Sequence, residues 1–503
     1  MRMPAPEAPT EPTREDARED GLSRRRLLAG TAALTLAPFV AAAQAPGRKP
    51  APADKATGKP AETPEIKPAE TKTLKAAPAK TRLKPEPAPE TAVWRLGEAS
   101  APPVLRVKLG EAVRLRVENG TDRPLSLHWH GVRNRNAMDG VGGVTQEPIA
   151  PGKDFLYEFT PPDAGTFLIR PLVVGGASEP SGRGLACLLV VEEGSPPPVD
   201  QDVALLLQDW RLDEAGALLP FGQVAFAAAS GRLGNAVTLN GGPIPLTLEG
   251  RPGSRIRLRL ANACNARALR IRVDGVKVYV AAVDGQPADT FEPLKATLPF
   301  APGTRYDLLL DLPKEAGSAG TITALVGQGL PLATLTVAGD PAAQTGRGPI
   351  ASIPENRRLP SEIRLQSALR RDLVLTGGVK PDRAKPGAEP PYTGDPQKIW
   401  QINGASGAAG APPLFTVKRG QVVVLTIRND TGFPQILHLH GHVFRLLHLL
   451  DDGWEPYWLD TVQIPEGRHA QIAFIADNPG RWLLSSTVLE RFDTGLWTSF
   501  EVS

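Results

Sequence analysis

The chain has 503 residues, a formal net charge of +3 and two cysteines. Its length allows several domains with substantial cores, and the small net charge argues against a nucleic-acid-binding surface. Two cysteines exclude a disulfide scaffold. Cys187 and Cys264 could pair between domains, although we favour two buried thiols.

The N-terminus has the pattern of an export signal. Adjacent arginines at 24–26 follow a long polar leader and precede a mostly apolar run, and residues 43–45 offer a small-residue cleavage site. The arginines resemble a twin-arginine signal. We therefore interpret residues 1–45 as a signal peptide that directs the protein to the periplasm. The alternative is an uncleaved membrane anchor, although the run is short for a span and contains Pro38. No other stretch is long and apolar enough to span a membrane.

Residues 46–92 are rich in proline, alanine, lysine and glutamate and have almost no aromatic or β-branched side chains. Such a composition cannot bury a core, so we predict a disordered, extended linker. We favour a solvated spacer, and the alternative is a tether to the cell envelope or to a protein partner.

After the predicted linker, short runs of alternating apolar residues are separated by turn signals. Val113, Leu115 and Val117 alternate, for example, and Asn119-Gly120 follows them as a turn. Many short strands and no long helical pattern predict an all-β chain of sandwiches or barrels.

Most histidines of the chain lie in two short stretches. The first contains His128 and His130, and the second contains His438, His440 and His442. Residues i and i+2 of a strand point to the same face, so each stretch should present its histidines together. Paired imidazoles on a rigid strand are common copper or zinc ligands. We predict His128, His130, His438 and His440 as metal ligands and expect His442 to be structural, bonded to the backbone.

The two stretches lie in repeated contexts. Asn119 precedes His128 by nine residues, and Asn429 precedes His438 by the same number. A third copy lies between them and has no histidine, with Asn262, Ile271 and Val273 at the corresponding positions. The chain therefore has three related β units, with histidines only in the first and the last.

These motifs resemble the multicopper oxidases, which are periplasmic or secreted enzymes built from cupredoxin-type Greek-key domains. The resemblance covers about residues 93–503 and rests on the segments 128–131, 139–146, 209–212, 284–287, 438–444 and 477–482. It implies three consecutive cupredoxin-like Greek-key β-barrels or sandwiches, which we place at residues 93–195, 200–340 and 360–503.

The resemblance also implies copper ligands, of which only part is present. It assigns His128 and His438 to a type 2 copper and His130 and His440 to type 3 coppers of a trinuclear cluster that reduces dioxygen to water. Other residues occupy the remaining ligand positions of the family, namely Arg170, Leu172, Gln435, Ser485, Ser486, Thr487, Arg491 and Leu496. Without a cysteine at 486, the blue copper through which electrons enter loses its thiolate.

Three hypotheses for the function follow. The first is a non-oxidase binding or scaffold protein in the periplasm, similar to the copper-free cell-division member of the family, which is exported by the twin-arginine route. The alternative is a copper-binding oxidoreductase that uses a reduced copper set. The third is an oxidase with a different electron entry, which the missing cysteine opposes. The expected cofactor is one copper ion or none, and the sequence identifies no partner or substrate.

Several residues near these motifs have a structural and a functional interpretation. We favour core packing for Trp129 and a turn role for Asp139. Arg170 should face the vacated half of the cluster, where a cation would repel copper. Ser485 and Ser486 are not predicted as nucleophiles, because no histidine lies beside them in the sequence.

Overall fold

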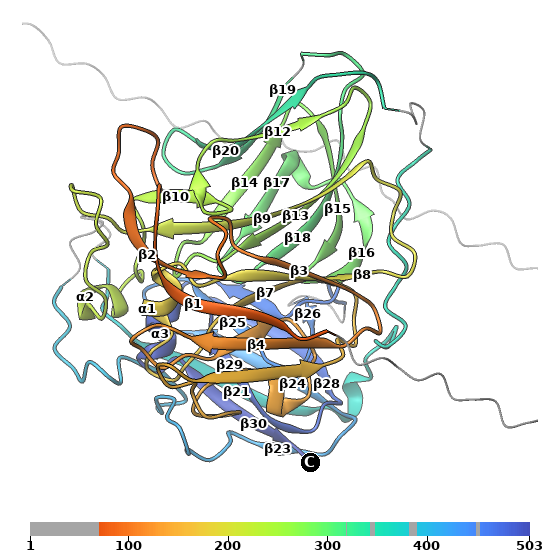
Figure 1. Cartoon of the computed structure of the whole chain (residues 1–503). Helices are drawn as coiled ribbons and strands as arrows, with labels where there is room; N and C mark the ends of the chain where they lie inside the picture. Colours follow the sequence, from red (N-terminus) through yellow and green to blue (C-terminus); the bar gives the residue numbers. More distant parts are fainter. Residues whose placement is uncertain (1–69, 318, 343–347, 382–389, 449–452) are drawn as a thin grey trace, which may run out of the picture. The chain divides into compact units, whose positions relative to one another are not determined.

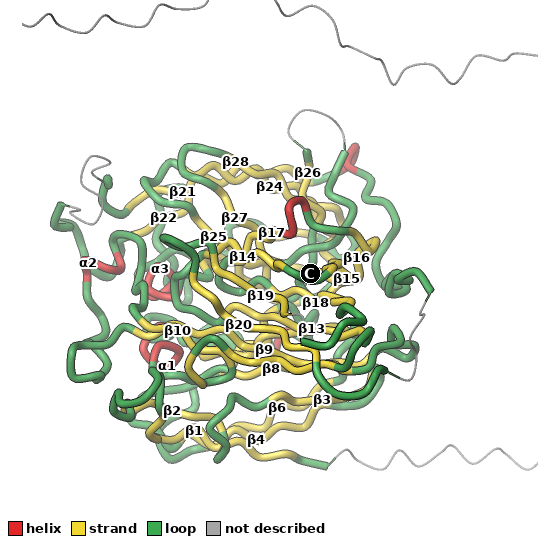
Figure 2. The backbone as a smooth tube through the Cα atoms, turned by 90° about the horizontal axis from the view of Figure 1, so that it is seen from above, coloured by secondary structure: helices red, strands yellow, loops and turns green. Residues whose placement is uncertain are grey.

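The computed structural model describes residues 70–317, 319–342, 348–381, 390–448 and 453–503. The predicted signal peptide and the linker up to residue 69 lie outside these residues. The strands form six sheets, which are taken below in pairs that follow the chain, and Figure 2 shows how strands predominate over a few short helices.

The first pair of sheets is formed by the N-terminal part of the described chain. One sheet has the order β2-β1-β4-β6 and the other the order β3-β8-β7-β5. The strands are β1 (Lys72–Thr81), β2 (Thr91–Leu96), β3 (Val104–Lys108), β4 (Val113–Asn119), β5 (Leu127–His130), β6 (Asp154–Phe159), β7 (Gly165–Pro171) and β8 (Cys187–Glu192). The predicted alternation in β4 is confirmed, since Val113, Leu115 and Val117 are buried.

The second pair has the orders β11-β10-β9-β13-β18-β15-β16 and β12-β20-β19-β14-β17. Its strands are β9 (Gln201–Trp210), β10 (Ala236–Leu239), β11 (Gly242–Pro243), β12 (Leu246–Gly250), β13 (Arg255–Asn262), β14 (Leu269–Asp274), β15 (Lys277–Val283), β16 (Gln286–Phe291), β17 (Thr297–Phe300), β18 (Arg305–Asp311), β19 (Ala319–Ala324) and β20 (Leu330–Val337).

The third pair has the orders β22-β21-β24-β28-β26 and β23-β30-β29-β25-β27. Its strands are β21 (Leu369–Gly377), β22 (Trp400–Ile402), β23 (Thr416–Val417), β24 (Gln421–Asn429), β25 (Gln435–Leu439), β26 (Arg445–Leu447), β27 (Thr461–Ile464), β28 (His469–Ala476), β29 (Gly480–Ser486) and β30 (Trp497–Val502). The prediction of an all-β chain built of three consecutive sandwich-like units is confirmed.

Helices are short and lie between strands. They are α1 (Ser178–Gly182), α2 (Val224–Ala227), α3 (Leu489–Asp493) and the 3-10 turns η1 (Asn136–Met138), η2 (Leu294–Ala296) and η3 (Leu365–Ser367). The Asp493 carboxylate accepts hydrogen bonds from the main-chain N–H groups of Ala177 (2.7 Å) and Ser178 (2.9 Å), which joins α3 to α1 (Figure 1). Among the helices of the described residues, none is long and apolar enough to span a membrane.

The predicted linker is wrong for the part that follows residue 71. β1 (Lys72–Thr81) pairs antiparallel with β2 and parallel with β4, so it lies inside its sheet. Its composition misled the prediction because small alanines rather than β-branched residues face the core, and Ala76 is fully buried. Backbone hydrogen bonds on both sides compensate for the few apolar side chains.

The sequence repeat corresponds to one hydrogen-bonded turn used three times. The buried Asn119 amide donates to the carbonyls of Arg123 (2.7 Å) and Ile149 (2.8 Å), which ties the end of β4 to a neighbouring segment. Asn262 donates in the same way over 3.1 and 2.8 Å, and Asn429 over 2.8 and 3.0 Å. Each unit therefore places the segment after its asparagine in the same manner.

Candidate metal centre

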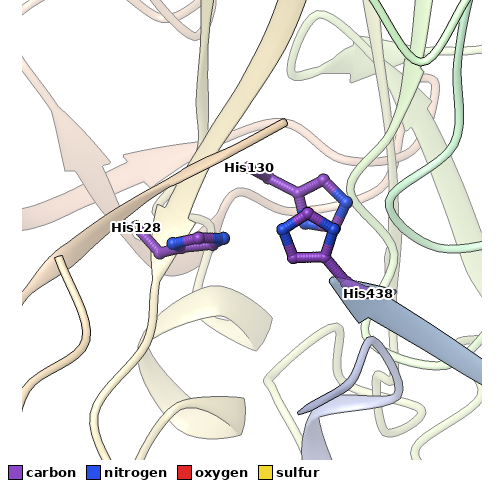
Figure 3. Close-up of side chains that lie close together, drawn as sticks. All are labelled: His128, His130 and His438. Carbon is purple, nitrogen blue, oxygen red and sulfur yellow. The ribbon is translucent and has the colours of Figure 1, made fainter. Parts of the chain in front are cut away.

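The structure brings together the four histidines that were predicted as ligands. β5 supplies His128 and His130 from the first unit, and β25 with the residue after it supplies His438 and His440 from the third. The rings of His130 and His438 stack with centroids 3.6 Å apart (Figure 3). The rings of His128 and His440 stack with centroids 4.2 Å apart. Ligand atoms of His128, His130 and His438 lie within 4.8 Å of one another.

Two of the four rings are held with a free Nε2 atom. His128 Nδ1 lies 2.8 Å from the carbonyl of Asp139, and His438 Nδ1 lies 3.0 Å from the carbonyl of Asp460. A carbonyl only accepts, so both rings donate through Nδ1–H. Their Nε2 atoms are buried and have no hydrogen-bond partner among the described residues. This orientation by a carbonyl is typical of metal-ligating histidines.

The other two rings use Nε2 for hydroxyl groups. His440 Nε2 lies 2.8 Å from Ser485 Oγ, and His130 Nε2 lies 2.9 Å from Thr461 Oγ1. Thr461 donates its own proton to Asp460 over 2.8 Å, so its oxygen accepts from His130. In this arrangement neither His130 nor His440 offers a free Nε2 to a metal ion.

Two buried carboxylates hold the histidines. Burial alone would raise the pKa of Asp139, but His440 and His128 hold it below its usual range. Burial would likewise raise the pKa of Asp460, but Arg305 and the hydrogen bonds from His130 and His438 keep it well below. Both groups are therefore anionic at neutral pH and favour a cation nearby.

Three of the four histidines have a lowered pKa and are neutral in this setting. Burial lowers the pKa of His438 and, with the neighbouring His128, lowers the pKa of His440 to about 3. Burial and His438 lower the pKa of His130 as well. A neutral imidazole is the form that binds a metal ion.

Ser485, His440 and Asp139 form a row that the sequence did not reveal. Ser485 Oγ contacts His440 Nε2 at 2.8 Å, and His440 Nδ1 donates to the Asp139 carboxylate at 2.9 Å. The order resembles a nucleophilic triad. However, Ser485 is only 3% exposed, which leaves no room for a substrate carbonyl, so the serine serves to fix His440. The predicted turn role of Asp139 thus omits its contact with His440.

In the segment that the resemblance assigned to the blue copper, side chains form hydrogen bonds with one another and with the main chain. Arg491 Nη1 donates to Gln435 Oε1 (2.6 Å) and to the carbonyl of Pro434 (2.7 Å), and its Nη2 donates to the carbonyl of Ala229 (2.9 Å). Ser486 Oγ lies 3.1 Å from the N–H group of Val488. Both Nη atoms of Arg491 thus have acceptors, whereas its Nε has no partner among the described residues.

Neither cysteine is among these residues. Cys187 is in β8 and Cys264 follows β13, and both are buried free thiols, so the favoured prediction of two unpaired thiols is confirmed. Burial raises the pKa of Cys187 to about 12, which keeps the thiol protonated.

Arg170 is a buried cation on the same face as His128. The two residues are direct neighbours across β5 and β7, and directly paired residues share a face of the sheet. Arg170 Nη1 donates to the carbonyl of Thr487 at 3.3 Å, and its Nε has no partner among the described residues. Burial and the nearby Arg305 lower the pKa of Arg170 to about 10.

His442 and Trp129 lie outside the cluster. β25 ends at Leu439 and Gly441 takes a positive φ of 66°, so His442 does not share the face of the other histidines, contrary to the alternation in the sequence. Its Nδ1 bonds to the carbonyl of His440 at 3.0 Å, so the structural role predicted for it is confirmed. Trp129 is fully buried against Tyr157, as core packing predicts.

Sequence reasoning missed the acidic and basic residues behind the histidines. Arg305 binds both oxygens of Asp460 (3.0 and 2.5 Å), and Asp284 accepts from the main-chain N–H of Arg305 (3.1 Å). Asp284 belongs to a motif that carried the resemblance, whereas Asp460 had no local signal. Its role depends on contacts to residues far away in the chain.

The buried histidine cluster lies between the first and the third β-sandwich units. Sequence models described as multicopper oxidase match residues 78–196, 201–328 and 384–503. A multicopper oxidase of Mycobacterium tuberculosis, MmcO, is 28% identical over 80% of this chain and 82% of its own length. Laccase-1 of Fomitopsis schrenkii is 27% identical over 76% of this chain and 78% of its own.

Solved structures agree with these matches. The multi-copper oxidase from Pseudomonas Parafulva is 32% identical, with a TM-score of 0.74, and the match covers 86% of this chain and 100% of that one. The enzyme from Pseudomonas Thermotolerans is 31% identical with the same TM-score, over 86% and 99%. The chain belongs to the multicopper oxidase family, and its fold is that of the three-domain cupredoxin members.

Proposed function

We propose that this protein holds one copper ion between His128 and His438. The observation that carries the proposal is the pair of buried Nε2 atoms without a partner among the described residues, on rings that main-chain carbonyls fix. A buried acceptor without a partner costs roughly 1–3 kcal/mol. A bound metal ion would satisfy both atoms at once.

The other copper positions of the family do not fit these residues. Hydroxyl groups occupy Nε2 of His130 and His440, and Arg170 places a cation on the same face. Arg491 and Gln435 fill the segment that the resemblance assigns to the blue copper. We therefore propose an oxidoreductase with a reduced copper set, in which the bound ion would supply one-electron redox chemistry. Asp139 and Asp460 fix the rings and contribute negative charge.

A metal-free binding or scaffold protein is the second candidate. It is favoured by Arg170, because a buried guanidinium near the histidines weakens cation binding. The relatives named above are oxidases and laccases, which favours the copper-binding candidate. The metal content of the protein separates the two.

The decisive experiment is metal analysis of the protein purified without chelator and reconstituted with copper, together with visible absorption and electron paramagnetic resonance. We expect one copper ion per chain, no blue absorption, and loss of the ion in both His128→Ala and His438→Ala. His448→Ala changes a histidine whose side chain is 41% exposed and should keep the ion. A chain that binds no copper would instead support the scaffold candidate.

We also propose that residues 1–45 direct export to the periplasm by the twin-arginine route. The support is the arginines at 24–26 before an apolar run and a small-residue site at 43–45. Replacing the three arginines by lysine should leave an uncleaved precursor inside the cell, which fractionation and intact-mass measurement detect. Unchanged processing would contradict the proposal.

A further inference from the structure

The histidine cluster offers a metal ion only a few nitrogen ligands. The ring nitrogens that are buried and have no hydrogen-bond partner among the described residues are Nε2 of His128, Nδ1 of His130 and Nε2 of His438. Because His130 donates to Thr461 through Nε2–H, its Nδ1 is an acceptor. Figure 3 shows His128 directed toward the stacked rings of the other two. An ion held here would therefore have two or three imidazole ligands.

Oxygen ligands do not complete this set. The hydroxyl groups of Thr461 and Ser485 are bonded to the other ring nitrogens, and Oδ1 of Asp139 lies 3.3 Å from Nδ1 of His128, which is already bonded. The three rings are at most 1% exposed, so bulk water does not reach them. Zinc prefers a tetrahedral set of ligands, and cupric ion prefers a square-planar or tetragonal one. A cuprous ion has a filled d shell, imposes no such geometry and accepts a low coordination number.

The charges around the histidines favour a monovalent ion over a divalent one. The two carboxylates that hold the rings, Asp139 and Asp460, are matched by two buried guanidinium groups, Arg305 and Arg170. No surplus negative charge among these four groups is left to compensate the second charge of a divalent ion. The repulsion from Arg170, which lies on the face that carries His128, is twice as large for a divalent ion as for a monovalent one.

We propose that this site selects cuprous ion and excludes cupric and zinc ions. The hydroxyl groups of Thr461 and Ser485 limit the number of ligands, and Arg170 penalises the second charge. The inference rests on the proposed function, because it specifies the oxidation state of the copper that His128 and His438 hold. By thermodynamic linkage, tighter binding of the reduced ion makes the bound copper easier to reduce than free cupric ion.

The test is competition between the protein and a chelator for each oxidation state. Cuprous ion is supplied with ascorbate under nitrogen against bicinchoninate, and cupric ion is supplied in air against nitrilotriacetate. We expect cuprous ion to bind at least about tenfold more tightly, because the second charge doubles the repulsion from Arg170. Equal or tighter binding of cupric ion would overturn the inference and leave the copper site in place. Binding of neither ion would contradict the proposed function and the inference with it.

Two variants assign the preference to named side chains. Arg170→Met removes the buried charge and should raise the cupric affinity about tenfold more than the cuprous affinity, whereas Arg170→Lys keeps the charge and should keep the preference. Ser485→Ala frees Nε2 of His440 as a further ligand and should also favour cupric ion, even if Arg170→Met does not fold.

The matched control for Ser485→Ala is Ser499→Ala, at another serine that is buried but lies outside the cluster. It should leave both affinities unchanged. X-ray absorption of the copper-loaded protein gives a separate readout, for which we expect a cuprous edge and only two or three nitrogen neighbours. An unchanged ratio of the two affinities in the folded Arg170→Met and Ser485→Ala variants would overturn the inference.

Discussion

The histidine cluster and the segment around Arg491 both lie where the resemblance assigns copper. They differ in how their polar atoms are hydrogen-bonded. In the cluster, His128 and His438 keep buried Nε2 atoms without partners among the described residues. Around Arg491, both Nη atoms donate to Gln435 or to main-chain carbonyls. The histidine cluster therefore has unpaired nitrogen atoms that are available to an added ligand. The Nη atoms of Arg491, in contrast, bond to groups of the chain itself.

If copper binds as proposed, this difference separates the retained metal site from the lost one. A replaced ligand destabilises a buried site unless the new side chain finds hydrogen-bond partners. Arg491 and Gln435 are hydrogen-bonded to each other, so neither side chain needs copper as a partner. His128 and His438 are held by carbonyls that fix only one nitrogen, and so their second nitrogen still favours a metal ion.

The largest expected effect comes from restoring copper ligands in the segment around Arg491. Gln435→His, Ser486→Cys and Arg491→His together would restore two imidazoles and a thiolate, the donor set of blue copper sites. We expect a second copper ion per chain and a blue absorption, measured by metal analysis and visible spectroscopy. The matched variant that keeps Ser486 should remain colourless, and a colourless triple variant would show that more than these side chains was lost.

Breaking the ion pair behind the cluster should be nearly as severe. Arg305→Gln leaves Asp460 buried without its bidentate partner, and breaking a buried pair costs about 3–5 kcal/mol. We expect this loss in the free energy of unfolding from urea titration. Arg428→Gln removes an exposed pair with Asp430 and should cost less than about 1 kcal/mol. Equal losses would mean that Arg305 is not essential to the cluster.

His442 tests the electrostatics of burial outside the cluster. Burial lowers its pKa to about 4, while the unfolded chain binds this proton near pH 6.5. The stability that neutral His442 contributes is therefore complete above about pH 6.5 and falls as the pH drops toward 4. His442→Phe should flatten this fall by about 1.4 kcal/mol per pH unit, seen in urea titrations across this range. Parallel curves for both proteins would contradict the assignment.

The smallest expected effect comes from replacing Arg170. Arg170→Met removes a buried cation from the face that carries His128, and this should strengthen copper binding about tenfold, or on the order of 1.4 kcal/mol. Competition with a copper chelator of known affinity measures the change. Arg123→Met, at a side chain that is 54% exposed, should leave the affinity unchanged. An unaltered affinity in Arg170→Met would mean that the guanidinium is screened from the site.

Much of the fold and part of the histidine cluster could be predicted from the sequence. Alternating apolar residues and asparagine turns gave the strands and the three units, because these signals are local. The histidine spacing placed His128 and His130 on one face, and the resemblance to the multicopper oxidases placed His438 in the same cluster. His442 failed the same rule because the positive φ of Gly441 ends the alternation, which spacing alone does not reveal.

The rest depends on contacts between distant segments. Asp460 and Ser485 reach the histidines only after β27 and β29 pair with β25, so no sequence window joins them. β1 was missed for a different reason, since its stability comes from backbone pairing on both sides rather than from its side chains.

The three asparagine turns also bear on how such a protein can change during evolution. Asn262 makes the same main-chain bonds as Asn119 and Asn429, although Ile271 and Val273 stand where the other units have histidines. The turn that shapes each unit is thus encoded separately from the positions that bind metal. Duplicated units can then gain or lose metal ligands by single substitutions while the asparagine turns are kept. In this architecture the function can therefore change without loss of the fold.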